Sequence, residues 1–456
     1  MIRISCRLIV LCFLLIPKMA PAADTVAAEA AGASLVQTRD LPAARVLAQG
    51  FPSQPIIGGD GDDVVILWRD EQLGPWQWWM RRSSDAGRNF DEPVLLKWIP
   101  GLATPQAAGT AGRLHLCWNM FAEPGRDEVY YANIDLGSGA ASKVRRLSGG
   151  NVSSSHCLIL ARGRQVAVMW QDVSASQTLT DMLMAYSVDG GESFQRELEL
   201  GWALWALPHF ALAAETSLIH AVWTTEVAPD KGVWYARIDP LARSVRKQHL
   251  LPDLGTVTLG AHAQTVVIGS GGKLLISNNS GAAFDQSVDI DPAPSPRYPG
   301  DVTGQRIGLG SVAVYVDPSL IGVVASRGMF GEVYFSASRD GGATFSPVEN
   351  LSLQDFPHGQ RGAANPGIIS VGTKLVVAWN EFDTPDKKEY LAFRSSADQG
   401  RTFAPVRRSP ILTRDGNVTS SPAVAAGGDA LLFAWSEPGD ARRNRTGRLM
   451  LLRVTP

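Results

Sequence analysis

The chain has 456 residues, with 42 Lys and Arg against 44 Asp and Glu, so its formal net charge is only −2. This balance excludes the basic surface that nucleic acid or an anionic membrane would need. The 45 Gly and 13 Trp, set among short apolar runs, direct attention to internal repeats.

The first residues are predicted to form a secretory signal peptide over residues 1–22. Arg3 and Arg7 precede an apolar segment, 8–16, and small residues follow at 20–23. The apolar segment is far shorter than the roughly 20 residues that a bilayer span needs, and no later segment approaches that length. We therefore expect an exported protein, periplasmic or extracellular, without a membrane span, and a flexible segment over 23–33.

Cysteine usage leaves one pair after the predicted signal is removed. Cys6 and Cys12 belong to the signal, and Cys117 and Cys157 remain. Two cysteines are too few for a disulfide scaffold. In an oxidising compartment they either form a single bridge or pack as two small buried hydrophobes.

An apolar strand that ends in Trp recurs along the chain. The tryptophans are Trp68, Trp118, Trp170, Trp223, Trp379 and Trp435, at intervals of 50, 52, 53, 156 and 56 residues. Because 156 is three times 52, two further repeats lack the Trp, and their strands end near Gly269 and Ala325. The spacing predicts eight units of about fifty residues.

The units before the last each supply four strands, named A to D from the axis outward, which is the pattern of a β-propeller blade. The last unit has only three, and its outer edge would be left unpaired. Segment 44–50 is similar in sequence to segment 144–150, which is an outer D strand. We therefore expect the N-terminal segment to complete the last blade. The predicted fold is all-β, a single propeller of eight four-stranded antiparallel blades over 34–456. Seven blades are the alternative, because the fifth unit is short.

Five turns after strand C share the pattern Ser-x-Asp-x-Gly-x-x-Phe, with Asn for Asp in one copy. Ser and Asp oxygens can bond turn amides, Gly can take positive φ, and the aromatic ring can fold back over the sheet. We interpret these octets as structural. They are centred on Asp85, Asp189, Asn279, Asp340 and Asp398.

These octets resemble the Asp box, or BNR repeat, of the sialidase-like β-propeller superfamily. The resemblance extends over essentially the whole chain after the predicted signal. It implies a propeller whose boxes lie at the periphery, away from the active site. Fold alone does not imply hydrolysis, since many proteins with such boxes are not hydrolases.

The stretch 74–90, GPWQWWMRRSSDAGRNF, holds three tryptophans just before the first octet. Aligned on Asp85, Trp78 and Trp79 occupy strand-C positions that are mostly apolar in every unit, so we expect them to pack within the blades. Trp76 falls in the loop between strands B and C. That loop lies on what we call the top face, the face that carries the B-to-C and D-to-A loops and where related propellers bind ligands. Trp76 is therefore a candidate ligand-binding residue.

A ring of polar residues is predicted near the axis on the top face, fourteen residues before each Trp. The positions are Gln54, Thr104, His156, His209, Asn365 and Ser421. His156 and His209 fall in adjacent blades, an arrangement that could share a metal, a water or an anionic ligand. Because channel-lining positions are wet in any propeller, we predict no metal and no cofactor there.

Acidic residues follow strand B, two residues after the Trp in most units. They are Asp70, Asp172, Glu381 and Glu437, with Glu226 one place later. Such carboxylates could bind a hydroxyl-rich ligand or act as a general acid. The alternative, which we favour, is that they satisfy local loop amides.

A sialidase needs an arginine cluster for the sugar carboxylate, a tyrosine nucleophile and an acid/base aspartate. Where the family has its first arginine motif, this chain reads FPSQPII (51–57), without arginine. Weak catalytic candidates are Arg297, Tyr298, Asp301, Arg306 and Arg361. We therefore predict a non-catalytic module that binds a glycan or a protein through its top face. The alternative is a divergent exo-sialidase or other glycoside hydrolase.

Overall fold

The computed structural model describes residues 42–71, 76–123, 126–149, 152–173, 180–203, 209–213, 216–225, 230–252, 257–270, 272–290, 309–327, 331–352, 361–383, 388–409, 423–437 and 446–456. The chain divides into two compact units, 1–37 and 38–456, and every described residue belongs to the second. The predicted signal peptide and the segment 23–33 lie outside the described residues. No helix in the described ranges is long and apolar enough to cross a membrane.

The regular elements of the described residues are all strands, arranged in eight four-stranded antiparallel sheets. The first four blades are β2 (Pro52–Asp60), β3 (Asp63–Asp70), β4 (Gln77–Ser83), β5 (Val94–Leu95); β6 (Gln106–Thr110), β7 (Arg113–Glu123), β8 (Arg126–Asp135), β9 (Arg145–Arg146); β10 (Ser153–Arg162), β11 (Gln165–Val173), β12 (Thr180–Ser187), β13 (Gln195–Ala203); and β14 (His209–Leu212), β15 (Ile219–Thr225), β16 (Gly232–Asp239), β17 (Ser244–Leu251).

The next four blades repeat this order from the axis outward. They are β18 (Val257–His262), β19 (Thr265–Ser270), β20 (Lys273–Ser277), β21 (Gln286–Asp289); β22 (Leu309–Asp317), β23 (Leu320–Arg327), β24 (Val333–Ser338), β25 (Glu349–Asn350); β26 (Arg361–Val371), β27 (Lys374–Asp383), β28 (Lys388–Ser396), β29 (Arg407–Arg408); and β30 (Ala423–Gly427), β31 (Ala430–Glu437), β32 (Gly447–Val454), β1 (Arg45–Gly50).

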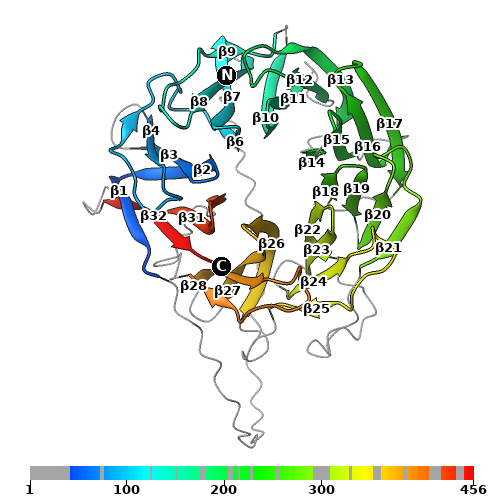
Figure 1. Ribbon diagram of the computed structural model, residues 1–456. Helices are drawn as coiled ribbons and strands as arrows, with labels where there is room; N and C mark the ends of the chain where they lie inside the picture. Colours follow the sequence, from blue (N-terminus) through cyan, green and yellow to red (C-terminus); the bar gives the residue numbers. More distant parts are fainter. Residues whose placement is uncertain are drawn as a thin grey trace, which may run out of the picture. The chain divides into compact units, whose positions relative to one another are not determined.

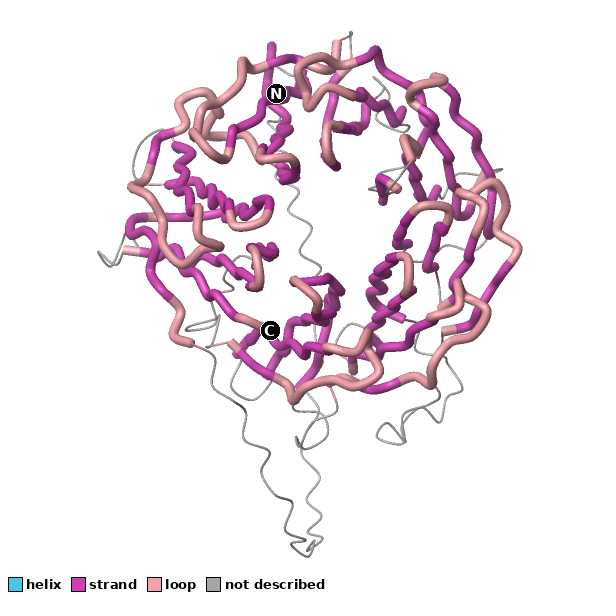
Figure 2. Tube along the Cα trace, viewed as in Figure 1, coloured by secondary structure: helices cyan, strands magenta, loops and turns pink. Residues whose placement is uncertain are grey.

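The eight sheets follow one another round a ring (Figures 1 and 2). Each innermost strand contacts that of the next blade, from β2 and β6 round to β30, and β30 contacts β2 again. The eight-bladed propeller predicted from the Trp spacing is therefore confirmed, and the seven-bladed alternative is wrong. The short fifth unit still supplies four strands, β18 to β21.

The last blade combines both ends of the described chain. Strand β1 pairs antiparallel with β32, from Arg45 opposite Leu451 to Gly50 opposite Gly447. This pairing covers the edge that the last three strands would expose, as predicted. The guanidinium of Arg45 also donates to the backbone oxygens of Gly87 and Arg88 in blade 1.

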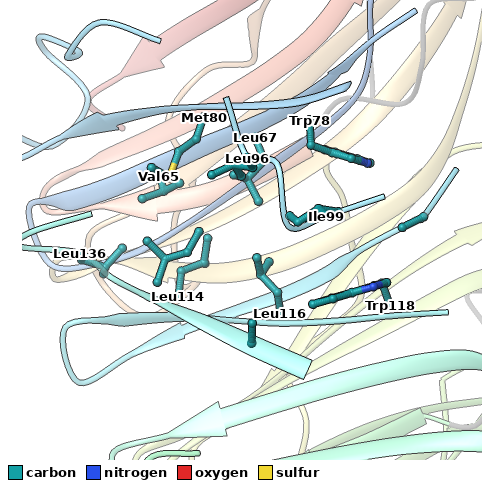
Figure 3. Packing of buried hydrophobic residues seen from close by; sticks show 13 residues of the cluster. Val65, Leu67, Trp78, Met80, Leu96, Ile99, Leu114, Leu116, Trp118 and Leu136 are labelled. Atoms are coloured by element: carbon teal, nitrogen blue, oxygen red, sulfur yellow. The ribbon is translucent and has the colours of Figure 1, made fainter. Parts of the chain in front are cut away.

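The core lies in the seams between blades rather than in one central cluster. Trp78 is fully buried and belongs to the same cluster as Trp118 of blade 2, as Figure 3 shows. The neighbouring Trp79 points to the other face of its sheet and packs with Leu432 in the seam with blade 8. This alternation is the period of two of a β-strand. It confirms the prediction that both tryptophans pack within the ring.

The octet turns, by which we mean the five turns centred on Asp85, Asp189, Asn279, Asp340 and Asp398, share one hydrogen-bond pattern. In the third blade Ser187 Oγ donates to Asp189 Oδ1 at 2.7 Å, and the Gly191 amide donates to Ser187 Oγ at 2.9 Å. The Ser193 amide then donates to Asp189 Oδ1 at 2.9 Å. The side chains thus satisfy amides that the tight turn leaves unpaired.

Each octet turn also joins its blade to the preceding one. Gly191 has φ +84, and a Cβ built there would lie 1.8 Å from Tyr131 Oη of blade 2. The turn's Phe194 meets the Tyr131 ring edge-on at 4.7 Å between centroids. Only a glycine satisfies both the backbone conformation and this close approach.

His115 fixes the tyrosine against which this glycine packs. Tyr131 Oη lies 2.7 Å from His115 Nδ1, within hydrogen-bond distance, and burial lowers the pKa of His115 to about 4, so the imidazole is neutral. Blade 4 repeats the arrangement with His220 and Tyr235 at 2.6 Å. The position three residues before the Trp is therefore structural, as its repetition in the sequence indicates.

Cys117 and Cys157 face each other across the seam between blades 2 and 3. Both are buried free thiols, with their sulfur atoms 2.6 Å apart. Burial, and then the contact with Cys157, raises the pKa of the Cys117 thiol well above its usual value. In this state the pair packs as two small hydrophobes within the cluster that contains Trp170.

The octet glycine generates a first prediction. Gly191→Ala is expected to destabilise the protein by at least about 3 kcal/mol, because it adds overpacking against Tyr131 to the cost of positive φ. The matched control is Gly163→Ala in the same blade, where φ is +54 but a Cβ meets nothing within 4 Å. The control should lose only about 1 kcal/mol. Urea unfolding measures both, and equal losses would contradict the close approach.

The octet aspartates generate a prediction on pH. Hydrogen bonds from the Thr344 side chain and amide, and then from Ser338, lower the pKa of Asp340 to about 2. A pKa lowered on folding contributes stability that is present above pH about 4 and is lost as the pH falls towards 2. Asp340→Asn should keep the fold, because Asn279 makes the same two bonds through Oδ1 in blade 5, with Ser277 Oγ at 2.8 Å and the Ala283 amide at 2.9 Å. Its melting temperature should fall less between pH 5 and 2 than that of the unaltered protein. An identical fall in both proteins would contradict a contribution of Asp340 to the pH dependence.

Candidate functional site

Three of the predicted ring residues occupy the same strained position on strand A. Gln54, His156 and Asn365 are exposed and have φ values of +48, +54 and +52. In each blade the register with strand B shifts by one at this point, as in a β-bulge. Because left-handed φ costs about 1–2 kcal/mol for a residue with a Cβ, the surrounding ladder must hold the bulge in place.

The bulges occur where strand A faces the repeated tryptophan. In blade 3, Ser155 pairs with Gln171 and Leu158 with Met169, so His156 and Cys157 together oppose Trp170. The His156 side chain stays outside the ladder, with Nδ1 3.0 Å from Ser155 Oγ. The same count places two residues opposite Trp68 and two opposite Trp379.

The other predicted ring residues differ. Thr104 is exposed just ahead of β6, and His209 is exposed at the start of β14. Ser421 lies outside the described residues. Among the described ring residues, those of blades 1, 3 and 7 therefore share one conformation, and Thr104 and His209 do not share it. Among the residues that the structure describes, no three His, Cys, Asp or Glu side chains are grouped so as to hold a metal ion.

The acidic residues after strand B are held by contacts within their own blades. Asp172 Oδ1 accepts from Ser154 Oγ at 2.6 Å and from Trp170 Nε1 at 3.1 Å, and burial raises its pKa. Glu381 is buried and accepts from Arg408 Nε at 2.5 Å and Nη2 at 3.1 Å.

The remaining two acids of this set also have partners. Glu437 accepts from Arg448 Nε at 2.8 Å, and Asp70 accepts from the Phe51 amide at 3.3 Å. Glu226, one residue later in its unit, lies outside the described residues. The contacts of these four described acids hold the ends of the top loops in place.

Trp76 is the aromatic residue that the top face presents to solvent in blade 1, with 38% of its surface exposed. The guanidinium carbon of Arg69 lies 4.2 Å from the centre of its ring. Arg69, itself 7% exposed, donates through Nε to Glu71 at 3.1 Å, and Glu71 also accepts from Ser53 Oγ at 2.6 Å. The cation is thus fixed and holds one face of the indole.

Leu102 lies beside the Trp76 platform, by which we mean the Trp76 indole stacked on the Arg69 guanidinium. It is 70% exposed, and its neighbour Gly101 approaches so closely that a Cβ there would lie 1.9 Å from the Trp76 carbonyl oxygen. Sequence reasoning found Trp76 but missed Arg69, Glu71 and Leu102. The signal was an arginine directly after the strand-B Trp of the first unit, a position that alternation places on the opposite face from Trp68.

None of the predicted hydrolase residues has a side chain among those that the structure describes. Arg297, Tyr298, Asp301 and Arg306 lie outside the described residues. Arg361 begins β26, opposite Asp383, and only its backbone is described.

No family model and no curated protein matches this chain. Among solved structures, it is similar to the polysaccharide lyase Uly1, with 10% identity and a TM-score of 0.48, over 92% of this chain and 93% of that one. The WD40 domain of SCAP from fission yeast gives 8% and 0.46, over 90% and 98%. The Hadza microbial sialidase Hz136 gives 10% and 0.36, over 64% of this chain and 66% of that one, so the chain spans just under two thirds of its length. These values are too low to support any statement about activity.

The strained bulge generates a prediction that tests the site's geometry. His156→Asn should change the free energy of unfolding by less than about 0.5 kcal/mol, because Asn takes positive φ readily and Asn365 does so in blade 7. His156→Val should cost about 1–2 kcal/mol, because a β-branched residue does not. Urea unfolding followed by circular dichroism measures both. A Val variant as stable as the Asn variant would mean that His156 has no such strain.

Proposed function

We propose that this protein is a non-catalytic binding module that takes up a glycan on its top face, in blade 1. The observation that carries the proposal is the Trp76 indole, partly exposed and braced by the Arg69 guanidinium 4.2 Å from its centre. An amphipathic aromatic ring held in one orientation offers an apolar face to the C–H face of a sugar without losing further side-chain entropy on binding.

Polar groups around the platform supply the hydrogen bonds that a sugar also needs. Glu71 is one third exposed, and the ring residue Gln54 is exposed on the adjoining strand. Carboxylate and carboxamide groups can accept from or donate to sugar hydroxyls. A protein ligand would instead use Leu102 and Trp76 as an apolar patch, and the experiment below distinguishes the two ligands.

The proposal includes export and the assignment of the octet turns to the Asp-box repeat. Export rests on the basic and apolar pattern of residues 1–22. The Asp-box assignment rests on the shared Ser-Asp-Gly-Phe pattern and its common hydrogen bonds. The turns lie on the face opposite Trp76, because A-to-B and C-to-D turns bond each other, as Ala86 does to Asp62 at 2.8 Å. They therefore support the ring rather than the ligand.

A glycan array, followed by titration calorimetry with the glycan that it identifies, tests the proposal. Trp76→Ala should weaken binding at least about tenfold, equivalent to about 1.4 kcal/mol, while Trp76→Phe should retain most of it. The matched control is Leu241→Ala, an exposed residue in a C-to-D turn, which should bind as the unaltered protein does. Glycan binding that survives Trp76→Ala in a folded protein would contradict the platform.

Leu102→Ala separates the two ligand classes. A glycan ligand should lose little affinity, whereas a protein ligand that uses the apolar patch should lose as much as with Trp76→Ala.

Hydrolysis of a fluorogenic sialoside tests the sialidase alternative. Turnover that disappears in an Arg306→Ala/Tyr298→Phe double variant would establish an enzyme and overturn the non-catalytic proposal.

A further inference from the structure

A cavity of about 460 Å³ lies in the inner part of the seam between blades 7 and 8. Its walls come from β26, β27 and β28 on one side and from β30 and β31 on the other, and they include Gly367, Ala378, Trp379 and Val424. The volume is within the roughly 300–1,000 Å³ typical of small-molecule sites. The ring residue Asn365 is both exposed and part of the lining, so the cavity is accessible from the top of the channel.

The cavity has a cause in the sequence of blade 7. In blade 1, the residue two places after the bulge is Ile56, paired with Leu67, and both pack in the seam with blade 2. In blade 3 the equivalent pair is Leu158 and Met169, packed in the seam with blade 4.

Blade 7 replaces this large pair with Gly367 and Ala378. A Cβ built on Gly367 meets nothing within 4 Å, and Ala378 belongs to the cluster of the seam with blade 8. Two large apolar side chains are therefore missing from the position that blades 1 and 3 fill. On the far wall Val424 is 43% exposed, although it belongs to an innermost strand.

The lining defines the chemistry of an occupant. Most of it is aliphatic, with Leu391 and Leu431 from the apolar cluster of this seam and Ile369 packed against that cluster. The polar side chains that the lining offers are the carboxamides of Asn365 and Asn380. Ser311 Oγ of blade 6 donates to Asn365 Oδ1 at 3.4 Å, which leaves the Asn365 amide nitrogen as the donor of that carboxamide. None of the described lining residues is ionisable, so a charged ligand would be desolvated without compensation.

We propose that this cavity binds a neutral small molecule with an apolar body and one hydrogen-bonding group, the body filling the space beside Gly367 and the polar group meeting Asn365 or Asn380. The site is independent of the glycan platform in blade 1. Gly367 is the residue that makes it available, because a larger side chain there would occupy the volume.

The test uses N-phenyl-1-naphthylamine, a neutral probe whose fluorescence rises in apolar surroundings. We expect saturable binding to one site on the full protein. Gly367→Leu introduces the residue type that blade 3 has at this position, Leu158. It should reduce the affinity for the probe at least tenfold and leave the melting temperature unchanged or higher. Ala378→Met is the second filling variant and should act in the same direction. Trp76→Ala is the control and should leave probe binding unchanged, so failure of the glycan proposal does not affect this test.

The polar part of the proposal is tested by competition. 1-Naphthol should displace the probe at a lower concentration than naphthalene does, and Asn365→Ala/Asn380→Leu should abolish that difference. No saturable binding to the unaltered protein, or equal binding by a folded Gly367→Leu variant, would overturn the site. Equal displacement by naphthol and naphthalene would overturn the assigned role of the two asparagines.

Discussion

The packing of one blade against the next is the interaction on which the rest of the structure depends. A four-stranded sheet has two apolar faces and cannot bury either alone, so each must be covered by a neighbour. The alternation of Trp78 and Trp79 shows how this is done, since one side chain enters each adjacent seam. In a row of such sheets, the outer faces of the first and last sheets are covered only when the row closes into a ring. Strand β1 closes it by pairing with β32. The ring is therefore a consequence of seam burial together with edge pairing.

Much of this fold can be predicted from sequence because the seam repeats. The Trp spacing predicts the blade number, and the likeness of 44–50 to 144–150 predicts the closing strand. Counting also finds Gln54, His156 and Asn365 as equivalent positions. It does not find their positive φ, because a bulge is a mismatch between two strands and counting along one strand cannot reveal it. Arg69 is missed for a related reason: its stacking on Trp76 depends on the position of the indole relative to strand B in space, which the sequence does not give.

The acidic residues after strand B show a second limit. Their shared position suggests a shared role, yet the partners differ between blades. Asp172 and Glu381 both accept from the indole of the strand-B Trp, but Asp172 also takes a serine and Glu381 an arginine from an outer strand. Partner identity is set by residues distant in sequence, and pairs of this kind orient loops as readily as they bind ligands. Repetition of a residue type therefore identifies a position in the fold, and only its contacts identify its function.

The seam between blades 7 and 8 lacks part of its apolar filling, and other contacts hold it. At the opposite end of these strands Arg407 Nη1 donates to the Thr455 carbonyl at 2.9 Å, and Lys374 Nζ donates to that of Pro456. These polar contacts join blade 7 to the end of the chain, while Arg453 Nε joins blade 8 to blade 1 through the Ala86 carbonyl at 2.7 Å. Blade 8 is also the blade that β1 closes. Because pairing and hydrogen bonds fix blade 8 from several sides, its seam with blade 7 can lose side-chain volume at the inner end without opening the ring.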